Sequence, residues 1–436
     1  MLKTTGAALR KIQPAEPRQR YGGGLLRRIF PESVELLPNT NQYWELDVAS
    51  GELASLETEE DLIRYGSFFS RVNGKETRHF SICKASPLQV DKSTSIRRQT
   101  FFDYNQFKTG YATHGLFPYR GKFHPQLVGA MMNVMGLRAG DLVLDPMGGS
   151  GTLAIEASIR GINSISVDVS PFCTLMAKAK IETLAIDAAL LRQALSDTLV
   201  AIAEGVNKIG PQDLFKGKTT LYDVVKDAGV PKNCQNVVML CYMDAVGYAA
   251  RRVRKTWQDL YPVIVGRYLD AIERFAEVQE RLGIVLGSAD AQVGDARKLR
   301  IKNNSVDGIV TSPPYSFAID YAENDRPQLQ YLGADVDALK DEMLGLIGGK
   351  KREVRVQRYF RDMETVFSEM YRVLKPGGCC VVVIGSNEIQ TGGIRHEVEF
   401  AKFAKSVGFE LFWQMARPIE GIRNSMRDEY VMFFQK

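Results

Sequence analysis

The sequence lacks the long apolar runs of a membrane protein and a leader of the secretory type. Its 436 residues contain no stretch of about 18 apolar residues, which a membrane-spanning helix needs. The opening segment, MLKTTGAALRKIQPAEPRQRYGGG, has no apolar centre like that of a secretory signal. These absences predict a cytoplasmic protein without a membrane partner.

Cysteine and histidine are scarce, which argues against disulfides and metal centres. The six cysteines form no C-x-x-C pair, so we expect reduced thiols and no structural zinc. There are only four histidines, and His114, His124 and His396 lack the carboxylate-rich spacing of a metal site. Core or surface roles are therefore favoured for these histidines, and no metal is expected.

Charge of one sign does not dominate the chain. The formal net charge is +5, which permits a polyanionic partner but does not require one. Basic residues gather in three clusters, at 18–28, 251–255 and 350–358. Solvated faces and phosphate-binding surfaces explain such clusters equally well.

The chain divides into an uninterpreted start and an α/β region. Residues 1–105 carry no motif and are assigned to an accessory region of unclear role; within them, 43–48 alternates like a strand and 59–69 is typical of a short helix. From 106 onward, strands 142–145 and 164–168 each lead into an apolar helix. This succession predicts a parallel sheet covered by helices.

A second division lies within the α/β region, between its halves 106–181 and 284–436. Apolar residues recur at helical spacing over 256–282, so we predict that 182–283 is an all-helical insertion. Its role is target recognition or simple extension of the scaffold. After it, the sequence predicts strands 291–294, 306–311 and 379–384, a loop and helix over 316–350, helices 357–373 and 396–406, and a closing hairpin of 410–415 and 429–434.

The first chemical signal is the turn Asp145-Pro146-Met147-Gly148-Gly149-Ser150-Gly151-Thr152, between a strand and a helix. Glycines let the backbone approach a ligand, and the helix amino terminus supplies free N–H groups. The turn is neither a Walker A loop nor G-x-G-x-x-G. Taken alone, it indicates either a dinucleotide or S-adenosyl site or a ligand-free tight turn.

Two carboxylates at the next strand ends favour the ligand. Asp168 ends the second strand, where an acid accepts hydrogen bonds from ribose hydroxyls. Asp295 closes the third strand, where a carboxylate meets an adenine amino group. Each acid by itself is more often a cap or a turn residue, but their combination with the glycine turn favours a binding site.

The decisive signal is Ser312-Pro313-Pro314-Tyr315, directly after a predicted strand. Two consecutive prolines fix a rigid, extended corner. An exocyclic amine is a poor nucleophile because its lone pair is delocalised into the ring. The Ser312 side chain and the Pro313 carbonyl are suited to accept the amine hydrogens and so concentrate that lone pair. Tyr315 offers a face on which an extruded base stacks.

On these motifs the chain resembles the amino-methyltransferases of DNA, and within them the cytosine-N4 group. The resemblance covers roughly 106–181 and 284–436. It implies a doubly wound, mostly parallel α/β sheet of the S-adenosylmethionine-dependent methyltransferase (Rossmann-like) type, here with a large helical insertion. It is carried by YATHGLFPYRGKFHPQLV over 111–128, the glycine turn with Glu156, Asp168, Asp295, Ser-Pro-Pro-Tyr, and LKPGG over 374–378.

The resemblance also implies the site and its cofactor, S-adenosylmethionine. In the family, the segment that matches 117–125 folds over the methionine part of the cofactor, and the Pro-Pro motif binds the target amine. Met147 departs from the phenylalanine that is usual at its position. The expected cofactor-binding residues are Phe123, Pro125, Asp145, Pro146, Gly148, Ser150, Gly151, Thr152, Asp168 and Asp295, and the expected catalytic residues are Ser312, Pro313, Pro314 and Tyr315.

The implied activity is sequence-specific methylation of cytosine N4 in DNA, with the base extruded from the duplex. Serine in the first motif position favours cytosine N4, whereas aspartate is commoner in adenine-N6 enzymes. The family also implies a restriction-modification link, with a cognate endonuclease encoded separately. Alternatives are adenine N6 in DNA, a base of structured RNA, an idle scaffold and a dinucleotide-dependent oxidoreductase. Carbon-5 cytosine chemistry is excluded, because it needs a cysteine after a proline and no Pro-Cys occurs.

Overall fold

The structure is a computed structural model of the whole chain. It describes residues 29–38, 40–85, 109–119, 121–196, 204, 220–249, 256–314, 320–344, 351–385, 393–418 and 428–436. Tyr315 and the basic clusters at 18–28 and 251–255 lie outside these residues. None of the helices in the described part of the chain combines the length and the apolarity needed to cross a membrane.

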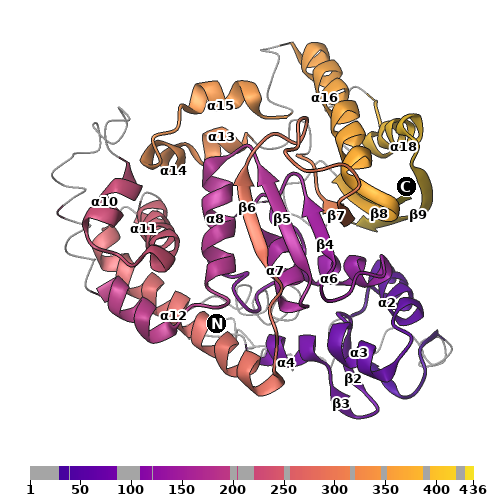
Figure 1. Ribbon diagram of the computed structural model, residues 1–436, viewed down its shortest axis with the longest axis horizontal. Coiled ribbons are helices and arrows are strands. Elements are labelled where there is room, and N and C mark those ends of the chain that lie inside the picture. Colours follow the sequence, from indigo (N-terminus) through magenta and orange to yellow (C-terminus); the bar gives the residue numbers. More distant parts are fainter. Residues whose placement is uncertain are drawn as a thin grey trace, which may run out of the picture.

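A seven-stranded sheet forms the centre of the molecule (Figure 1). Its order is β6-β5-β4-β7-β8-β10-β9, and β10 alone runs in the direction opposite to the other strands. The chain proceeds outward from β4 to β6 and then returns to β7 on the other side of β4, so the order reverses between β4 and β7. The strands are β4 (Leu142–Asp145), β5 (Asn163–Asp168), β6 (Ala289–Val293), β7 (Val306–Thr311), β8 (Leu374–Gly385), β9 (Glu410–Pro418) and β10 (Asp428–Gln435).

Helices cover both faces of this sheet, as the alternation of buried side chains requires. Val143, Val381 and Val383 pack on the face covered by α6 (Pro125–Val134) and α7 (Thr152–Ile159). Their neighbours Leu144 and Val382 pack on the opposite face, against α16 (Arg352–Val373) and α18 (His396–Val407). The predicted doubly wound, mostly parallel α/β fold is confirmed, including the closing hairpin of β9 and β10.

The predicted helical insertion is also confirmed within the described residues. It contains α10 (Leu221–Asp227), a short 3-10 turn (Lys232–Cys234), α11 (Gln235–Ala249) and α12 (Trp257–Leu282). The apolar repeat predicted for α12 is buried from Ile264 through Val278, whereas its first member, Leu260, is half-buried. The insertion packs on α8 (Pro171–Glu182). Figure 1 shows it beyond α8, on the side of the sheet where β6 is the edge strand.

The prediction of a strand over 43–48 is wrong, because these residues begin α2 (Tyr43–Ser55). Gln42 and Glu45 form a capping box at its start, and Trp44, Val48 and Glu52 recur at helical spacing on the buried face. The alternation over six residues was therefore part of a longer helical repeat. The helix predicted over 59–69 is shorter than expected: α3 (Glu59–Tyr65) ends before β2 (Phe69–Val72).

Two further predictions change in detail. The loop and helix expected over 316–350 contain three short helices in the described residues, α13 (Tyr321–Asn324), α14 (Arg326–Tyr331) and α15 (Val336–Glu342). Helix α16 begins at Arg352, earlier than the predicted 357.

The region 29–85 shares its core with the sheet. It comprises β1 (Val34–Leu36), α2, α3, β2, β3 (Lys75–Glu76) and α4 (Arg78–Ala85). Phe68 and Val48 belong to the same apolar cluster as Met131 of α6 and Phe433 of β10. The Arg417 guanidinium of β9 lies over the Trp44 ring, 5.1 Å from its centroid. This region thus adds to the cover over one face of the sheet.

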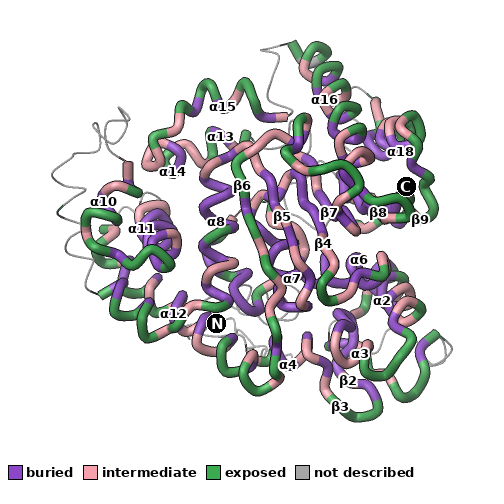
Figure 2. The backbone as a smooth tube through the Cα atoms, in the orientation of Figure 1, coloured by how far each residue is buried: buried purple, intermediate pink, exposed green. Residues whose placement is uncertain are grey.

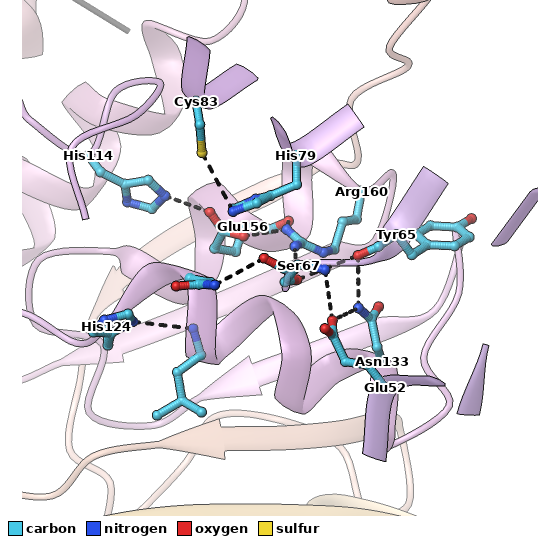
Figure 3. A network of polar contacts seen from close by, with 12 residues as sticks. Glu52, Tyr65, Ser67, His79, Cys83, His114, His124, Asn133, Glu156 and Arg160 are labelled. Atoms are coloured by element: carbon cyan, nitrogen blue, oxygen red, sulfur yellow. Dashed lines mark hydrogen bonds and ion pairs between the residues drawn. The ribbon is translucent and has the colours of Figure 1, made fainter. Parts of the chain in front are cut away.

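A buried polar network joins region 29–85 to α6 (Figure 3). The Glu52 carboxylate accepts hydrogen bonds from the Ser67 and Phe68 N–H groups at 2.9 and 3.0 Å, and from the Asn133 amide at 2.6 Å. Burial raises the pKa of Glu52 to about 7, although these donors and the charge of Arg160 oppose the rise. The carboxylate therefore accepts hydrogen bonds from several buried donors that solvent water does not reach.

The same network continues to α7 and to the segment before the sheet. Arg160 donates to the Ser67 hydroxyl at 2.7 Å and forms an ion pair with Glu156. Nε2 of His114 lies 2.7 Å from the Glu156 carboxylate, and burial lowers the pKa of His114 to about 4. The imidazole is therefore neutral at pH 7 and donates through Nε2. Burial alone would raise the pKa of Glu156, but Arg160 and His114 lower it to about 2.

We predict that Glu156→Gln strongly destabilises the fold. Arg160 would lose its ion-pair partner while remaining buried, and breaking such a pair costs about 3–5 kcal/mol. Denaturant unfolding measures the change in the free energy of unfolding. The control Glu277→Gln alters an exposed residue of α12 and should change stability by less than about 0.5 kcal/mol. Equal effects of the two substitutions would contradict this account.

Candidate active site

A pocket opens at the carboxyl ends of β4, β5, β6 and β7, where the strand order reverses. Open α/β sheets bind ligands at this position. The predicted Pro125, Gly151 and Pro313 are not part of its wall, and Tyr315 lies outside the described residues. The wall brings together Phe123, Asp145, Pro146, Gly148, Ser150, Thr152, Asp168 and Asp295 with the predicted catalytic residues Ser312 and Pro314.

The glycine turn explains how β4 reaches this pocket. Gly151 precedes α7 with a φ of +78°, and a Cβ there would lie 2.7 Å from the Cβ of Ala177 in α8. Only glycine therefore lets the turn approach α8 so closely. Gly149 also has a positive φ, of +49°, but a Cβ there would meet nothing within 4 Å. Gly149 lines the pocket, and the sequence-based selection of cofactor residues omitted it.

Asp145 joins the glycine turn to the strand that carries the proline corner. Its Oδ1 accepts a 2.7 Å hydrogen bond from the Thr311 hydroxyl at the end of β7, and a 3.1 Å bond from the Met147 N–H. Burial raises the pKa of Asp145 to about 7, although both donors oppose the rise. A positively charged ligand group in the pocket would therefore favour the ionised form of this carboxyl.

Asp168 ends β5 as predicted, with its carboxylate at the pocket wall. Oδ2 accepts a 2.8 Å hydrogen bond from the Gly149 N–H, and Oδ1 accepts one of 2.8 Å from the Ser170 N–H. Burial raises the pKa of Asp168 against the effect of these donors. Each carboxylate oxygen retains acceptor capacity for hydroxyl groups such as those of a ribose.

Asp295 lines the pocket but already has a strong partner. Arg297 donates to both of its oxygens, from Nε at 3.0 Å and from Nη2 at 2.8 Å. The same guanidinium forms an ion pair with Asp362 of α16 and donates to the Glu342 carbonyl. Arg297 therefore fixes the direction of the Asp295 carboxylate. The sequence analysis missed Arg297, although it stands only two residues away.

The proline corner follows β7 directly, with Pro313 buried and Ser312 and Pro314 at the pocket wall. The Tyr359 hydroxyl donates a 2.9 Å hydrogen bond to the Pro314 carbonyl. Tyr359 is buried on α16, and burial raises its pKa, so the hydroxyl stays protonated. No local sequence signal linked this tyrosine to the corner, because the two residues are far apart in the chain.

The remaining wall includes residues that the sequence analysis did not name for the site. Tyr119, from the segment expected to cover the cofactor, stacks on Tyr321 with ring centroids 6.5 Å apart. Met343, just after α15, also lines the pocket. Met343 belongs to the apolar cluster of the helical insertion, together with Tyr242 of α11. The insertion thus supports one wall of the pocket through the short helices.

No cluster of three or more histidine, cysteine or carboxylate side chains suited to a metal ion occurs among the described residues. His114 and His396 are both buried, and burial lowers the pKa of each to about 4. The expected core roles agree with these positions.

Two family models match overlapping parts of the chain, and both matches include the proline corner. A family of RMKL-like methyltransferase domains matches residues 116–332, including the glycine turn. The N6/N4 family of DNA methylases matches residues 306–436, which begin with β7 and the proline corner. Residues 306–436 thus match the family of DNA amino-methyltransferases. This finding confirms the family predicted from the motifs.

Individual members of this family and its relatives match parts of the chain. The Type II methyltransferase M.MjaII of Methanocaldococcus jannaschii is 38% identical over 103 residues, or 24% of this chain and 19% of the relative. M.BsoBI of Geobacillus stearothermophilus is 20% identical over 66% of this chain and 67% of the relative. A tRNA (guanine(10)-N2)-dimethyltransferase of Methanothermobacter thermautotrophicus is 32% identical over 18% of this chain and 24% of the relative.

S-adenosylmethionine is the cofactor of this family, and the pocket residues fit it. Asp168 would supply acceptors for the ribose hydroxyls, and the open side of Gly149 would leave room for the ligand. Asp145 would supply a carboxylate for a cationic group, and Phe123 and Tyr119 would supply apolar surface. These residues would hold the cofactor between the glycine turn and the proline corner.

We predict that Asp168→Asn weakens the binding of S-adenosylmethionine by about tenfold or more, since a hydrogen bond to a charged group contributes about 1.5–3 kcal/mol. Titration calorimetry measures the Kd. The control Asp290→Asn makes the same chemical change at an exposed position on the neighbouring strand β6 and should leave the Kd unchanged. A change below twofold in a folded Asp168→Asn protein would remove Asp168 from the cofactor site.

Proposed function

We propose that the chain methylates the exocyclic N4 amino group of cytosine in DNA, with S-adenosylmethionine as the methyl donor. One observation carries the proposal: Ser312 and Pro314 share a pocket wall with Asp145 and Asp168. A corner suited to an amine therefore faces the residues suited to the cofactor. Serine in the first position of the motif favours cytosine over adenine.

The proposed mechanism relies on positioning. The bound cofactor supplies an electrophilic methyl group on a sulfonium. The Ser312 hydroxyl, at the pocket wall, accepts an amine hydrogen, which directs the nitrogen lone pair out of the ring plane; the Pro313 carbonyl, predicted to accept the second hydrogen, is not part of the pocket wall in this structure. The Pro314 carbonyl is already engaged by Tyr359, so its own orientation is fixed. Holding the two reactants in line supplies much of the rate, and the proton released by the amine passes to solvent.

The setting of this activity is also part of the proposal. M.MjaII and M.BsoBI are Type II methyltransferases by name, which supports a sequence-specific DNA substrate and a link to restriction-modification. A cognate endonuclease would then be encoded separately. With chromosomal DNA as its substrate, the protein would act in the cytoplasm.

A base amine of RNA is the second candidate substrate. Two observations favour it: the RMKL-like match over 116–332 and the tRNA (guanine(10)-N2)-dimethyltransferase relative. The RMKL-like match includes the glycine turn and also the proline corner. DNA remains the preferred substrate because the DNA methylase match covers the proline corner and everything after it, over 306–436, and because two relatives are Type II methyltransferases by name.

The test is methyl transfer from labelled S-adenosylmethionine to unmethylated DNA and to RNA in parallel, with nucleoside mass spectrometry of the products. We expect N4-methylcytosine from DNA, reduced at least about a hundredfold by Ser312→Ala and by Pro314→Ala, because both remove amine positioning. The control Ser368→Ala, at an exposed position of α16, should retain activity. Detection of N6-methyladenine would show that adenine is the substrate, and label in RNA alone would show that RNA is. Absence of methyl transfer to either polymer would refute the proposal.

Tyr359→Phe tests the support of the corner. The substitution removes one neutral hydrogen bond, worth about 0.5–1.5 kcal/mol, so we expect kcat to fall about two- to twelvefold. The KM for S-adenosylmethionine should not change, because Tyr359 is not part of the pocket wall. Tyr371→Phe, on the same helix near the other end of the sheet, is the matched control. Unchanged kcat in Tyr359→Phe would show that the corner holds its shape without this bond.

A further inference from the structure

Helix α16 has an exposed cationic face that the proposed chemistry does not use. Lys351 at its start, Arg358 and Arg361 are all exposed. Their spacing, with the exposed Val354 and Thr365 between and after them, places all five positions on one side of the helix. Figure 2 shows exposed residues along this helix. We call Lys351, Arg358 and Arg361 the cationic stripe.

The three cations of the stripe have no acidic partner among the residues that the structure describes. Acidic residues of the helix with recorded partners are engaged elsewhere: Asp362 with Arg297, and Glu369 with Arg372. The stripe therefore presents uncompensated positive charge to solvent.

Helix stability does not explain this charge. Residues 351–362 contain five cationic and two acidic residues, whereas 363–373 contain one cationic and two acidic residues. Cations are unfavourable near a helix amino terminus and favourable near its carboxyl terminus. The observed distribution is the reverse, so it points to an external anionic partner.

The stripe and the pocket mouth lie at the same end of the sheet, the end where the parallel strands have their carboxyl termini. Helix α16 leads directly into β8, which runs parallel to β7, so the amino-terminal half of α16 lies at the carboxyl ends of the strands. Within this half, Tyr359 touches the proline corner through the Pro314 carbonyl. Arg358 is the adjacent residue and points to the exposed side. An anion bound by the stripe would thus flank the corner.

We infer that the cationic stripe binds the phosphate backbone of duplex DNA beside the target base. This inference rests on the proposed function. The stripe is about 15 Å long, from the helical rise per residue, and one strand of duplex DNA carries about four phosphates over that distance. The spacing of the charges therefore suits contacts to successive phosphates of one strand.

The test compares two triple variants of the full chain. The stripe variant is Lys351→Ala, Arg358→Ala and Arg361→Ala. The control variant is Arg300→Ala, Lys302→Ala and Lys405→Ala, which removes the same charge from exposed positions. Arg300 and Lys302 precede β7 and Lys405 precedes β9, so the control positions lie at the amino ends of these strands, away from the pocket.

Binding of an unmethylated DNA duplex is measured over a range of salt concentrations, with thermal unfolding as the check on folding. We expect the stripe variant to bind on the order of tenfold more weakly near 0.15 M salt, and its log Kd to depend on log salt with a slope about 2.7 smaller. The KM for DNA should rise while kcat at saturating DNA is retained. The control variant should match the wild type within about twofold.

Equal losses of DNA affinity in both variants would overturn the inference, because the total charge of the protein and not its position would then determine binding. No loss of DNA affinity in either variant would overturn it too, because these charges would then not contribute to binding. A loss of affinity for RNA but not for DNA would overturn it as well. Failure of the proposed function is distinguishable: the wild-type chain would bind S-adenosylmethionine but neither bind nor methylate DNA.

Discussion

The hydrogen bond from the Thr311 hydroxyl to the Asp145 carboxylate joins the two strand ends on which the site depends. It crosses from β7 to β4, where the strand order of the sheet reverses. The glycine turn begins at Asp145, and the proline corner begins after Thr311. Because one bond fixes both starting points, the cofactor residues and the amine residues are held in one frame. Arg160 and Glu156, which pair with each other, then join the helix that follows the glycine turn to Ser67 and to His114.

How much of this arrangement was predictable depends on the distance over which each signal acts. Strands β4 and β7 and the turns after them were predicted from the sequence alone, because apolar runs, glycines and prolines act locally. Helix α2 was mistaken for a strand because six residues do not separate a period of two from a helical repeat. Tyr359 was not predictable, since only the folded chain brings it to Pro314.

The helical insertion belongs to the catalytic unit more closely than its position in the sequence indicates. Met343 contributes both to the pocket wall and to the core of the insertion. Protein interiors are densely packed and transmit small displacements. If a ligand moved the insertion, this displacement would therefore be transmitted to the cofactor pocket through the short helices α13–α15, without a change in the sheet.

The contact between α2 and β9 has a consequence for biosynthesis. Trp44 lies beneath Arg417, and the core of region 29–85 includes Phe433 of β10. During translation this early region emerges long before its partners β9 and β10 exist. Contacts between segments so far apart in the sequence form slowly, and apolar surface that stays exposed until they form favours aggregation. We therefore expect the apolar face of region 29–85 to stay uncovered by β9 and β10 until these strands have been synthesised.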